Sequence, residues 1–265
     1  MRNKLTDELA VCGFNAVAAL GEYHPEAVNR LFLREDRIKS LGGLCRRLAE
    51  RKRLYKICSD EELERICKSS HHQGVVAMID APMVEGAAGE DIELWAAGGK
   101  TGLVLYSVGN DHNLGAIIRA AAFFDVHFVI LGESEGGAVL STSAYRVAEG
   151  GMEHVVVRSV RNTAAFLRDT SKRIVTIGAD VRARLRLRDL PSLLDRPAAG
   201  PRRPGSPSQT GRPAIALVLG NEETGLPGEV KEHCSALVRI PGTGNVESLN
   251  VAQAAALFLH GIFEL

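Results

Sequence analysis

Short apolar runs alternate with helical stretches from Leu103 to the C-terminal end, and this alternation constrains the fold more than any other feature of the sequence. The runs that we expect to be strands are Leu103–Val108, Val126–Leu131, His154–Val157, Arg173–Ile177, Ala214–Leu219 and Ala236–Ile240. Such alternation is typical of a parallel sheet that helices cover on both faces. The sequence therefore predicts an α/β fold for this part of the chain.

Residues 1–80 show strand and helix patterns on a smaller scale. One helix is expected within residues 41–53, because Leu41, Leu44, Cys45 and Leu48 share a helical face. Residues 81–100 are rich in Ala and Gly, include Pro82, and resemble a linker. We therefore predict a small α/β domain at 1–80, a linker at 81–100 and a larger domain at 101–265.

Charge is balanced overall but unevenly distributed. The formal net charge is 0, which by itself does not indicate a nucleic-acid-binding protein. Phosphate contacts are local, however, and arginines gather at 46–53 and at every second position from Arg182 to Arg188. Residues 191–213, rich in Pro, Gly, Ser and Arg, are expected to be a flexible basic insert between two strands.

The five cysteines indicate neither a disulfide framework nor a metal site. They form no C-x-x-C pair, and no histidine lies at metal-ligand spacing from any of them. The N-terminus has no apolar signal region, and no apolar run reaches the roughly 18 residues of a membrane span. We expect a cytoplasmic protein with reduced thiols, without a resident metal and without membrane contact.

Three polar, Gly-containing segments follow expected strands, at the sheet edge where open α/β sheets bind ligands. In the first, 109–121, Asn113 is placed to cap a helix and Arg119 lies among small and apolar residues, where a cation requires a partner. In the second, 217–227, Gly220 permits close approach of a ligand to the backbone and Glu222 supplies a carboxylate.

The third segment, 238–252, leads from a strand into the last helix. Ser248 and Asn250 stand at the helix start, where backbone N–H groups are available to an anionic group. The helix itself, expected from Ser248 to Phe263, combines small and large apolar residues, namely Ala252, Ala254, Ala255, Ala256, Leu257, Phe258 and Leu259. Small residues allow close helix approach and large ones supply burial, so this helix indicates a homodimer.

The order and spacing of these segments resemble the three motifs of the SpoU (TrmH) family of RNA 2′-O-ribose methyltransferases. The resemblance covers residues 101–265, with departures at Asn110-Asp111 and Gly242. Two shorter segments, at 13–17 and 72–77, resemble the N-terminal RNA substrate-binding domain that many members carry. The resemblance implies an α/β knot (SPOUT) fold, S-adenosylmethionine as cofactor, and rRNA or tRNA as the partner.

The resemblance also implies residue roles. The candidate catalytic residues are Asn113, Arg119, Glu222, Ser248 and Asn250. The candidate cofactor-binding residues are Leu219, Gly220, Ile240, Pro241, Ser248 and Leu249. For RNA binding, the basic N-terminal residues Arg46, Arg47 and Arg51 are the candidates. The proton acceptor stays open between Arg119, a phosphate and water, because a guanidinium is almost never neutral.

Three competing interpretations remain at this point. A non-catalytic RNA-binding protein of the same fold would bind no cofactor. A nucleotide-dependent oxidoreductase would be expected to carry a G-x-G-x-x-G fingerprint, which the first strand–helix unit lacks. A base methyltransferase of the same superfamily would be expected to show a different set of motifs.

Overall fold

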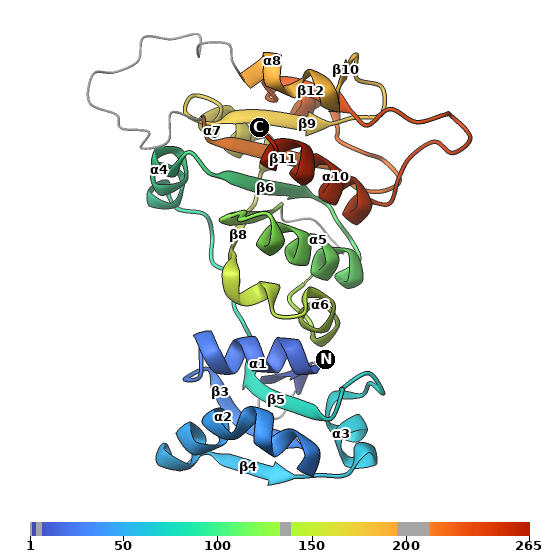
Figure 1. Cartoon of the computed structure of the whole chain (residues 1–265). Helices are drawn as coiled ribbons and strands as arrows, with labels where there is room; N and C mark the ends of the chain where they lie inside the picture. Colours follow the sequence, from blue (N-terminus) through green and yellow to red (C-terminus); the bar gives the residue numbers. More distant parts are fainter. Residues whose placement is uncertain (1, 4–6, 133–138, 195–212) are drawn as a thin grey trace. The chain divides into compact units, whose positions relative to one another are not determined.

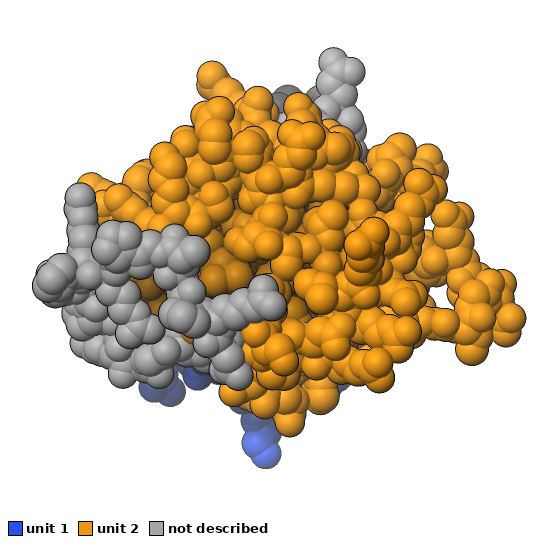
Figure 2. All heavy atoms as spheres, turned by 90° about the horizontal axis from the view of Figure 1, so that it is seen from above, with its two compact units in different colours: residues 1–83, 114–119, 139–154 blue, residues 84–113, 120–138, 155–265 orange. Residues whose placement is uncertain are grey.

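The computed structural model describes residues 2–3, 7–132, 139–194 and 213–265, which form two compact units. Unit 1 comprises residues 1–83, 114–119 and 139–154, and unit 2 comprises residues 84–113, 120–138 and 155–265 (Figure 2). Most of the insert expected at 191–213 lies outside the described residues. Within the described residues, no helix is long and apolar enough to cross a membrane.

Unit 1 contains a five-stranded sheet in the order β1-β2-β5-β3-β4, in which only the β3–β4 pair is parallel. Its strands are β1 (Arg2–Asn3), β2 (Glu8–Cys12), β3 (Val28–Leu33), β4 (Leu54–Ile57) and β5 (Val75–Asp80). Its helical elements are α1 (Phe14–Tyr23), η1 (Glu35–Arg37), α2 (Ile38–Glu50), α3 (Asp60–Cys67), α6 (Thr142–Ala148) and η2 (Gly151–His154).

Local sequence signals explain the helices of unit 1. The buried residues of α2 are Leu41, Leu44, Cys45 and Leu48, the face that the sequence predicts. Helix α3 begins with a capping box, in which Ser59 Oγ accepts from the Glu62 N–H and the Glu62 carboxylate accepts from the Ser59 N–H. Both helices therefore form where the periodicity and capping residues place them.

Unit 2 contains a parallel seven-stranded sheet in the order β10-β12-β9-β11-β6-β7-β8 (Figure 1). Its strands are β6 (Thr101–Tyr106), β7 (Phe128–Gly132), β8 (Val156–Val160), β9 (Val175–Ala179), β10 (Leu185–Arg186), β11 (Ile215–Leu219) and β12 (Ala236–Arg239). Its helical elements are α4 (Gly89–Gly98), α7 (Thr163–Thr170), η3 (Leu187–Asp189), α8 (Leu190–Leu194), α9 (Gly228–Lys231) and α10 (Val251–Phe263).

The predicted parallel α/β sheet is confirmed. Every residue of the central strand β11 is buried, as expected for a strand covered on both faces. Helix α10 lies beside β11 and buries Val251, Ala255, Phe258, Leu259 and Ile262 (Figure 1). The short strand β10 was not anticipated, because two residues give no periodicity to read.

Part of the segment that we expected to be a linker is structured. Helix α4 occupies Gly89–Gly98, and its Trp95 is 2% exposed in the core of unit 2. The Trp95 indole N–H donates to the Lys100 carbonyl at 3.0 Å. A Cβ atom on Gly102 would lie 2.2 Å from the Trp95 ring, so β6 requires a glycine at this position. The segment therefore contributes a buried tryptophan to the core of unit 2 and is not a linker throughout.

Candidate functional site

The three polar segments lie at the carboxyl ends of parallel strands. The first follows β6 and leads into helix α5 (Asp111–Phe123), the second follows β11, and the third follows β12 and leads into α10. Strands β6 and β11 are neighbours in register, with Leu105 opposite Leu219. Loops at the carboxyl edge of such a sheet are the usual place for a ligand site.

Asn113, Glu222 and Asn250 connect the three segments through side-chain hydrogen bonds. The Asn113 Nδ2 donates to Glu222 Oε1 at 2.5 Å, and the Asn250 Nδ2 donates to Asn113 Oδ1 at 3.0 Å. These two contacts fix which end of the Asn113 amide is the donor. The structure therefore brings together three of the five predicted catalytic residues; we call this set the Asn113–Glu222–Asn250 chain.

Asn113 does not cap its helix, contrary to the expectation from sequence. Asn110 is the N-cap of α5, and its Oδ1 accepts from the His112 N–H at 2.8 Å. Asn113 lies inside the first turn, and its amide is therefore available for the other segments. Asn250 does occupy an N-cap, where its Oδ1 accepts from the Ala252 N–H at 2.9 Å.

Asn221, which the sequence analysis did not single out, holds the second segment in shape. Its Nδ2 donates to the Ser107 carbonyl at 2.9 Å, and its Oδ1 accepts from the backbone N–H groups of Glu223 and Thr224 at 2.9 and 3.2 Å. An Asn side chain that accepts a hydrogen bond from the backbone two residues ahead commonly forms a turn. The role of Asn221 in the loop could therefore have been predicted from its residue type and position. Asn221 thus orders the loop that carries Glu222.

Gly220 is needed because the chain folds back on itself. A Cβ atom at this position would lie 2.4 Å from the Gly225 carbonyl carbon and 2.7 Å from the Leu226 nitrogen. We expected a ligand to approach the backbone here, but in the structure the approaching group is the chain's own turn. The glycine is therefore required for the loop conformation, whatever the loop binds.

The predicted cofactor-binding residues differ in accessibility. Leu219 is buried in β11 and Ile240 is half-buried, whereas Pro241, Ser248 and Leu249 belong to a stretch, 241–250, that is exposed throughout. Within the described residues, Ser248 makes no side-chain hydrogen bond and is not joined to the Asn113–Glu222–Asn250 chain. The exposed apolar side chains of Val246 and Leu249 suit a loop that packs against a planar ring such as adenine.

Arg119 has a different partner from the one that sequence reasoning assumed. Its Nη1 lies 3.2 Å from Glu149 Oε1, and its side chain is 59% exposed. Ile117, Ile118 and Ala121 are buried, so Arg119 lies on the opposite, exposed side of α5. The expectation that Arg119 places a charge on an apolar face of the helix is therefore wrong. Arg119 stays a candidate catalytic cation, because its exposed side chain can still contact a substrate.

The basic residues proposed for RNA binding are not equivalent. Arg46 and Arg51 are exposed at the C-terminal part of α2 and directly after it. Arg47 is also exposed, but its Nη1 donates to the Gly21 carbonyl at 3.2 Å. Arg47 therefore braces α2 against α1, whereas Arg46 and Arg51 are available to an external anion.

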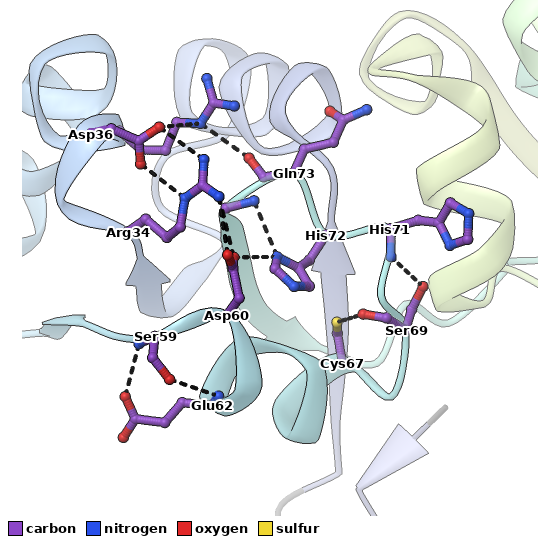
Figure 3. Close-up of polar contacts among 12 residues, drawn as sticks. Arg34, Asp36, Ser59, Asp60, Glu62, Cys67, Ser69, His71, His72 and Gln73 are labelled. Atoms are coloured by element: carbon purple, nitrogen blue, oxygen red, sulfur yellow. Dashed lines mark hydrogen bonds and ion pairs between the residues drawn. The ribbon is translucent and has the colours of Figure 1, made fainter.

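Unit 1 contains a second polar network, centred on Arg34 (Figure 3). Arg34 donates to both carboxylate oxygens of Asp36 at 2.9 Å and lies 3.1 Å from Asp60. The Arg34 guanidinium holds the pKa of Asp36 below its ordinary value. The Gly74 N–H donates to His72 Nδ1 at 3.1 Å, so this ring nitrogen is an acceptor and the His72–Asp60 contact is not an ion pair.

This network does not have the character of a phosphate site. Two carboxylates already neutralise Arg34, and the adjoining depression is lined by Arg34, Glu35, Asp36, Ile57, Cys58 and Ser59. None of these residues belongs to the three polar segments. The network instead connects η1, α3 and the loop before β5, and it serves as a structural brace (Figure 3).

Comparison with known proteins gives two family matches. Residues 100–260 match the model of the SpoU rRNA Methylase family, and residues 10–84 match a model described as RNA 2′-O ribose methyltransferase substrate binding. The five predicted catalytic residues and six predicted cofactor-binding residues all fall within the first match.

Two curated relatives are similar to the chain over nearly its whole length. The 23S rRNA (guanosine-2′-O-)-methyltransferase RlmB of Nitrosomonas europaea is 29% identical, covering 98% of this chain and 92% of the relative. The RlmB of Neisseria meningitidis is 30% identical, with 96% and 94% covered. Among solved structures, the SpoU methyltransferase AviRb of Streptomyces viridochromogenes in complex with AdoMet superposes with a TM-score of 0.73, at 20% identity, covering 100% of this chain and 93% of that one. The latter similarity shows the fold.

Proposed function

The chain belongs to the SpoU rRNA Methylase family, and on this basis we propose that it methylates the 2′-hydroxyl of a ribose in RNA, with S-adenosylmethionine as methyl donor. The observation that carries this proposal is the Asn113–Glu222–Asn250 chain, because it joins one residue from each of three segments at the carboxyl edge of the sheet. These contacts hold the three segments that carry the predicted catalytic residues next to one another.

S-adenosylmethionine supplies an electrophilic methyl group on a sulfonium. The residues that would hold it are Leu219, Gly220, Ile240, Pro241, Ser248 and Leu249. The second segment fits this role, since its turn is closed by Gly220 and Asn221 and presents a fixed backbone. The exposed loop 241–250 fits it as well, because it offers apolar side chains and backbone groups to an adenosine.

The chain's own residues would orient the ribose and stabilise the charge that develops as the 2′-hydroxyl loses its proton. Asn113 and Asn250 position the sugar, while Glu222 fixes the Asn113 amide by accepting its hydrogen bond. Holding reactants in line accounts for a large part of the barrier reduction in such transfers. Arg119 acts as a cation that binds the target phosphate and stabilises the developing oxyanion. The hydroxyl proton passes to a phosphate oxygen or a water, because the guanidinium stays protonated.

We further propose that the chain acts as a homodimer through the exposed side of α10. Leu257 and Phe263 are 45% and 55% exposed on this helix, and Phe123 near the end of α5 is 81% exposed. The Phe124 and Phe263 rings are 5.7 Å apart, which links the two helix ends into one apolar surface. A second copy of the chain is the occupant that buries such a surface isologously.

The relatives named above act on 23S rRNA, so we propose ribosomal RNA as the target and the cytoplasm as the location. The test is a map of ribose methylations in RNA from a deletion strain and its parent. We expect at least one rRNA position to lose its methyl group on deletion and to regain it when the purified protein and labelled S-adenosylmethionine are added. RNA binding without cofactor binding or any lost methylation would instead identify a non-catalytic RNA-binding protein.

A further inference from the structure

The edge of the unit 2 sheet carries two arginines side by side. Strands β10 and β12 are parallel neighbours, and their register places Arg186 opposite Arg239. Neighbouring strands lie about 4.8 Å apart, and paired residues on them point to the same face. Like charges in such positions repel each other. An anion bound between the two guanidinium groups would offset this repulsion.

The nearby carboxylates are already engaged. Asp180 Oδ2 lies 2.6 Å from Lys231 Nζ, and Asp180 Oδ1 accepts from the Arg182 backbone N–H at 2.7 Å. Asp189 Oδ2 accepts from the Arg186 backbone N–H at 2.8 Å, a contact that satisfies the backbone and not the guanidinium. Among the described residues, no carboxylate lies within ion-pair distance of the guanidinium groups of Arg184, Arg186 or Arg239.

Arg239 has a further unmet requirement. Its Nε is buried and, within the described part of the chain, has no hydrogen-bond partner. A buried charged donor without a hydrogen-bond partner is unfavourable, so an acceptor from a bound ligand would stabilise it. Other arginines of unit 2 have carboxylate partners: Arg158 lies 3.0 Å from Asp91, and Arg173 lies 3.2 Å from Glu93.

The position of the arginines relates them to the proposed chemistry. Arg239 ends β12 and directly precedes Ile240, so it borders the segment that carries Ser248 and Asn250. Arg186 ends β10 at the same carboxyl edge, and Arg184 is exposed just before that strand. An anionic chain bound here would run beside the candidate methyl-transfer site.

We propose that Arg184, Arg186 and Arg239, which we call the edge arginines, bind successive phosphates of the RNA strand that carries the target ribose. This inference rests on the proposed function. It assigns a second RNA contact, on the catalytic unit itself, in addition to the basic residues of unit 1. Arginine suits the role because its planar fork matches phosphate oxygens and it keeps its charge at any relevant pH.

The test compares the full-length protein with a variant carrying Arg184→Gln, Arg186→Gln and Arg239→Gln. The probe is a single-stranded 20-nucleotide uridine RNA, and its Kd is measured across a series of salt concentrations. Each lost phosphate contact lowers the slope of log K against log salt by about 0.7 for a single strand, so the slope should fall by about 2. The Kd at 0.1 M salt should rise by roughly tenfold or more.

A matched control removes the same charge elsewhere on unit 2. Arg168, Arg173 and Lys100 are paired with Asp169, Glu93 and Asp125, and their replacement by Gln should leave the slope unchanged. If the triple edge variant does not fold, Arg184→Gln alone, at an exposed position, should still lower the slope by about 0.7.

The outcomes separate this inference from the proposed function. An unchanged slope in the edge variants overturns the inference. So does a loss of S-adenosylmethionine affinity by calorimetry without a change in slope, because the arginines would then hold the cofactor carboxylate. Failure of the unaltered protein to methylate RNA would contradict the proposed function, while the slope would still report the phosphate contacts.

Discussion

Asn113 and Glu222 lie 109 positions apart in the chain, yet the Asn113 amide donates a 2.5 Å hydrogen bond to the Glu222 carboxylate. The contact joins the start of α5 to the loop after β11. It also leaves Asn113 Oδ1 as the acceptor for Asn250. In the proposed mechanism, Glu222 would therefore act through the amides of Asn113 and Asn250, without a contact of its own to the substrate.

Replacing Glu222 should impair methyl transfer through misplacement of Asn113. We expect Glu222→Ala to lower the single-turnover rate by about 10²-fold, since a small displacement of a positioning group has an effect of that order. Glu222→Gln should lose much less, because its carbonyl oxygen can still accept the hydrogen bond. The neighbouring Glu223→Ala is the control, because among the described residues Glu223 contacts the loop through its backbone N–H, which donates to Asn221. Equal rates in Glu222→Ala and the control would contradict this role.

Arg119 should matter for chemistry and little for stability. Its ion pair with Glu149 is largely exposed, and such pairs contribute about 0–1 kcal/mol. We expect Arg119→Ala to keep its Tm and its S-adenosylmethionine affinity while methyl transfer falls by about 10²–10³-fold. Arg119→Lys should recover little, because a point charge does not reproduce the planar fork.

Glu149→Gln separates the two roles of Arg119. It removes the same ion pair but leaves the Arg119 charge, so transfer should continue near the parent rate. If Arg119→Ala also methylates at the parent rate, the proposed oxyanion stabilisation is wrong. If Arg119→Ala unfolds, the residue is a structural ion-pair partner.

The exposed apolar surface of α5 and α10 should hold two copies of the chain together. Light scattering should give twice the chain mass of 28.5 kDa for the unaltered protein. Phe123→Asp with Leu257→Asp should give the single-chain mass, because two charges would have to be buried in the interface. Leu94→Asp, at an exposed apolar position of α4 outside the proposed interface, should remain a dimer. A single-chain mass for the unaltered protein at micromolar concentration would rule the dimer out.

The sequence predicted what local patterns encode. Six of the seven strands of the large sheet and the buried face of α2 follow from periodicity. The role of Asn113 could not be predicted in this way, because both its partners are more than 100 positions away. The burial of Trp95 could not be predicted from local patterns either, because the space over Gly102 that its ring fills exists only once the sheet has formed.

Cys234 should make stability fall at alkaline pH. Burial raises the pKa of its thiol from the ordinary value of 9.0 to about 12. A raised folded-state pKa gives stability that is fully present below pH 9 and is lost as the pH rises toward 12. Between pH 8 and pH 10 the free energy of unfolding should therefore fall by about 1 kcal/mol more than in Cys234→Ala. Denaturant titrations at both pH values measure this, and equal losses would show that the folded and unfolded thiols titrate alike.

The basic residues of unit 1 should divide into binding and bracing groups. Arg46→Gln and Arg51→Gln should each lower the salt slope for single-stranded RNA by about 0.7, with little effect on Tm, because both side chains are exposed. Arg47→Gln should instead lower the stability by about 1–3 kcal/mol, since its hydrogen bond to the Gly21 carbonyl is lost. Lys56→Gln is the control, because Glu62 already neutralises Lys56 at 3.1 Å. A slope that stays the same in Arg46→Gln and Arg51→Gln would assign both residues to an ordinary solvated surface.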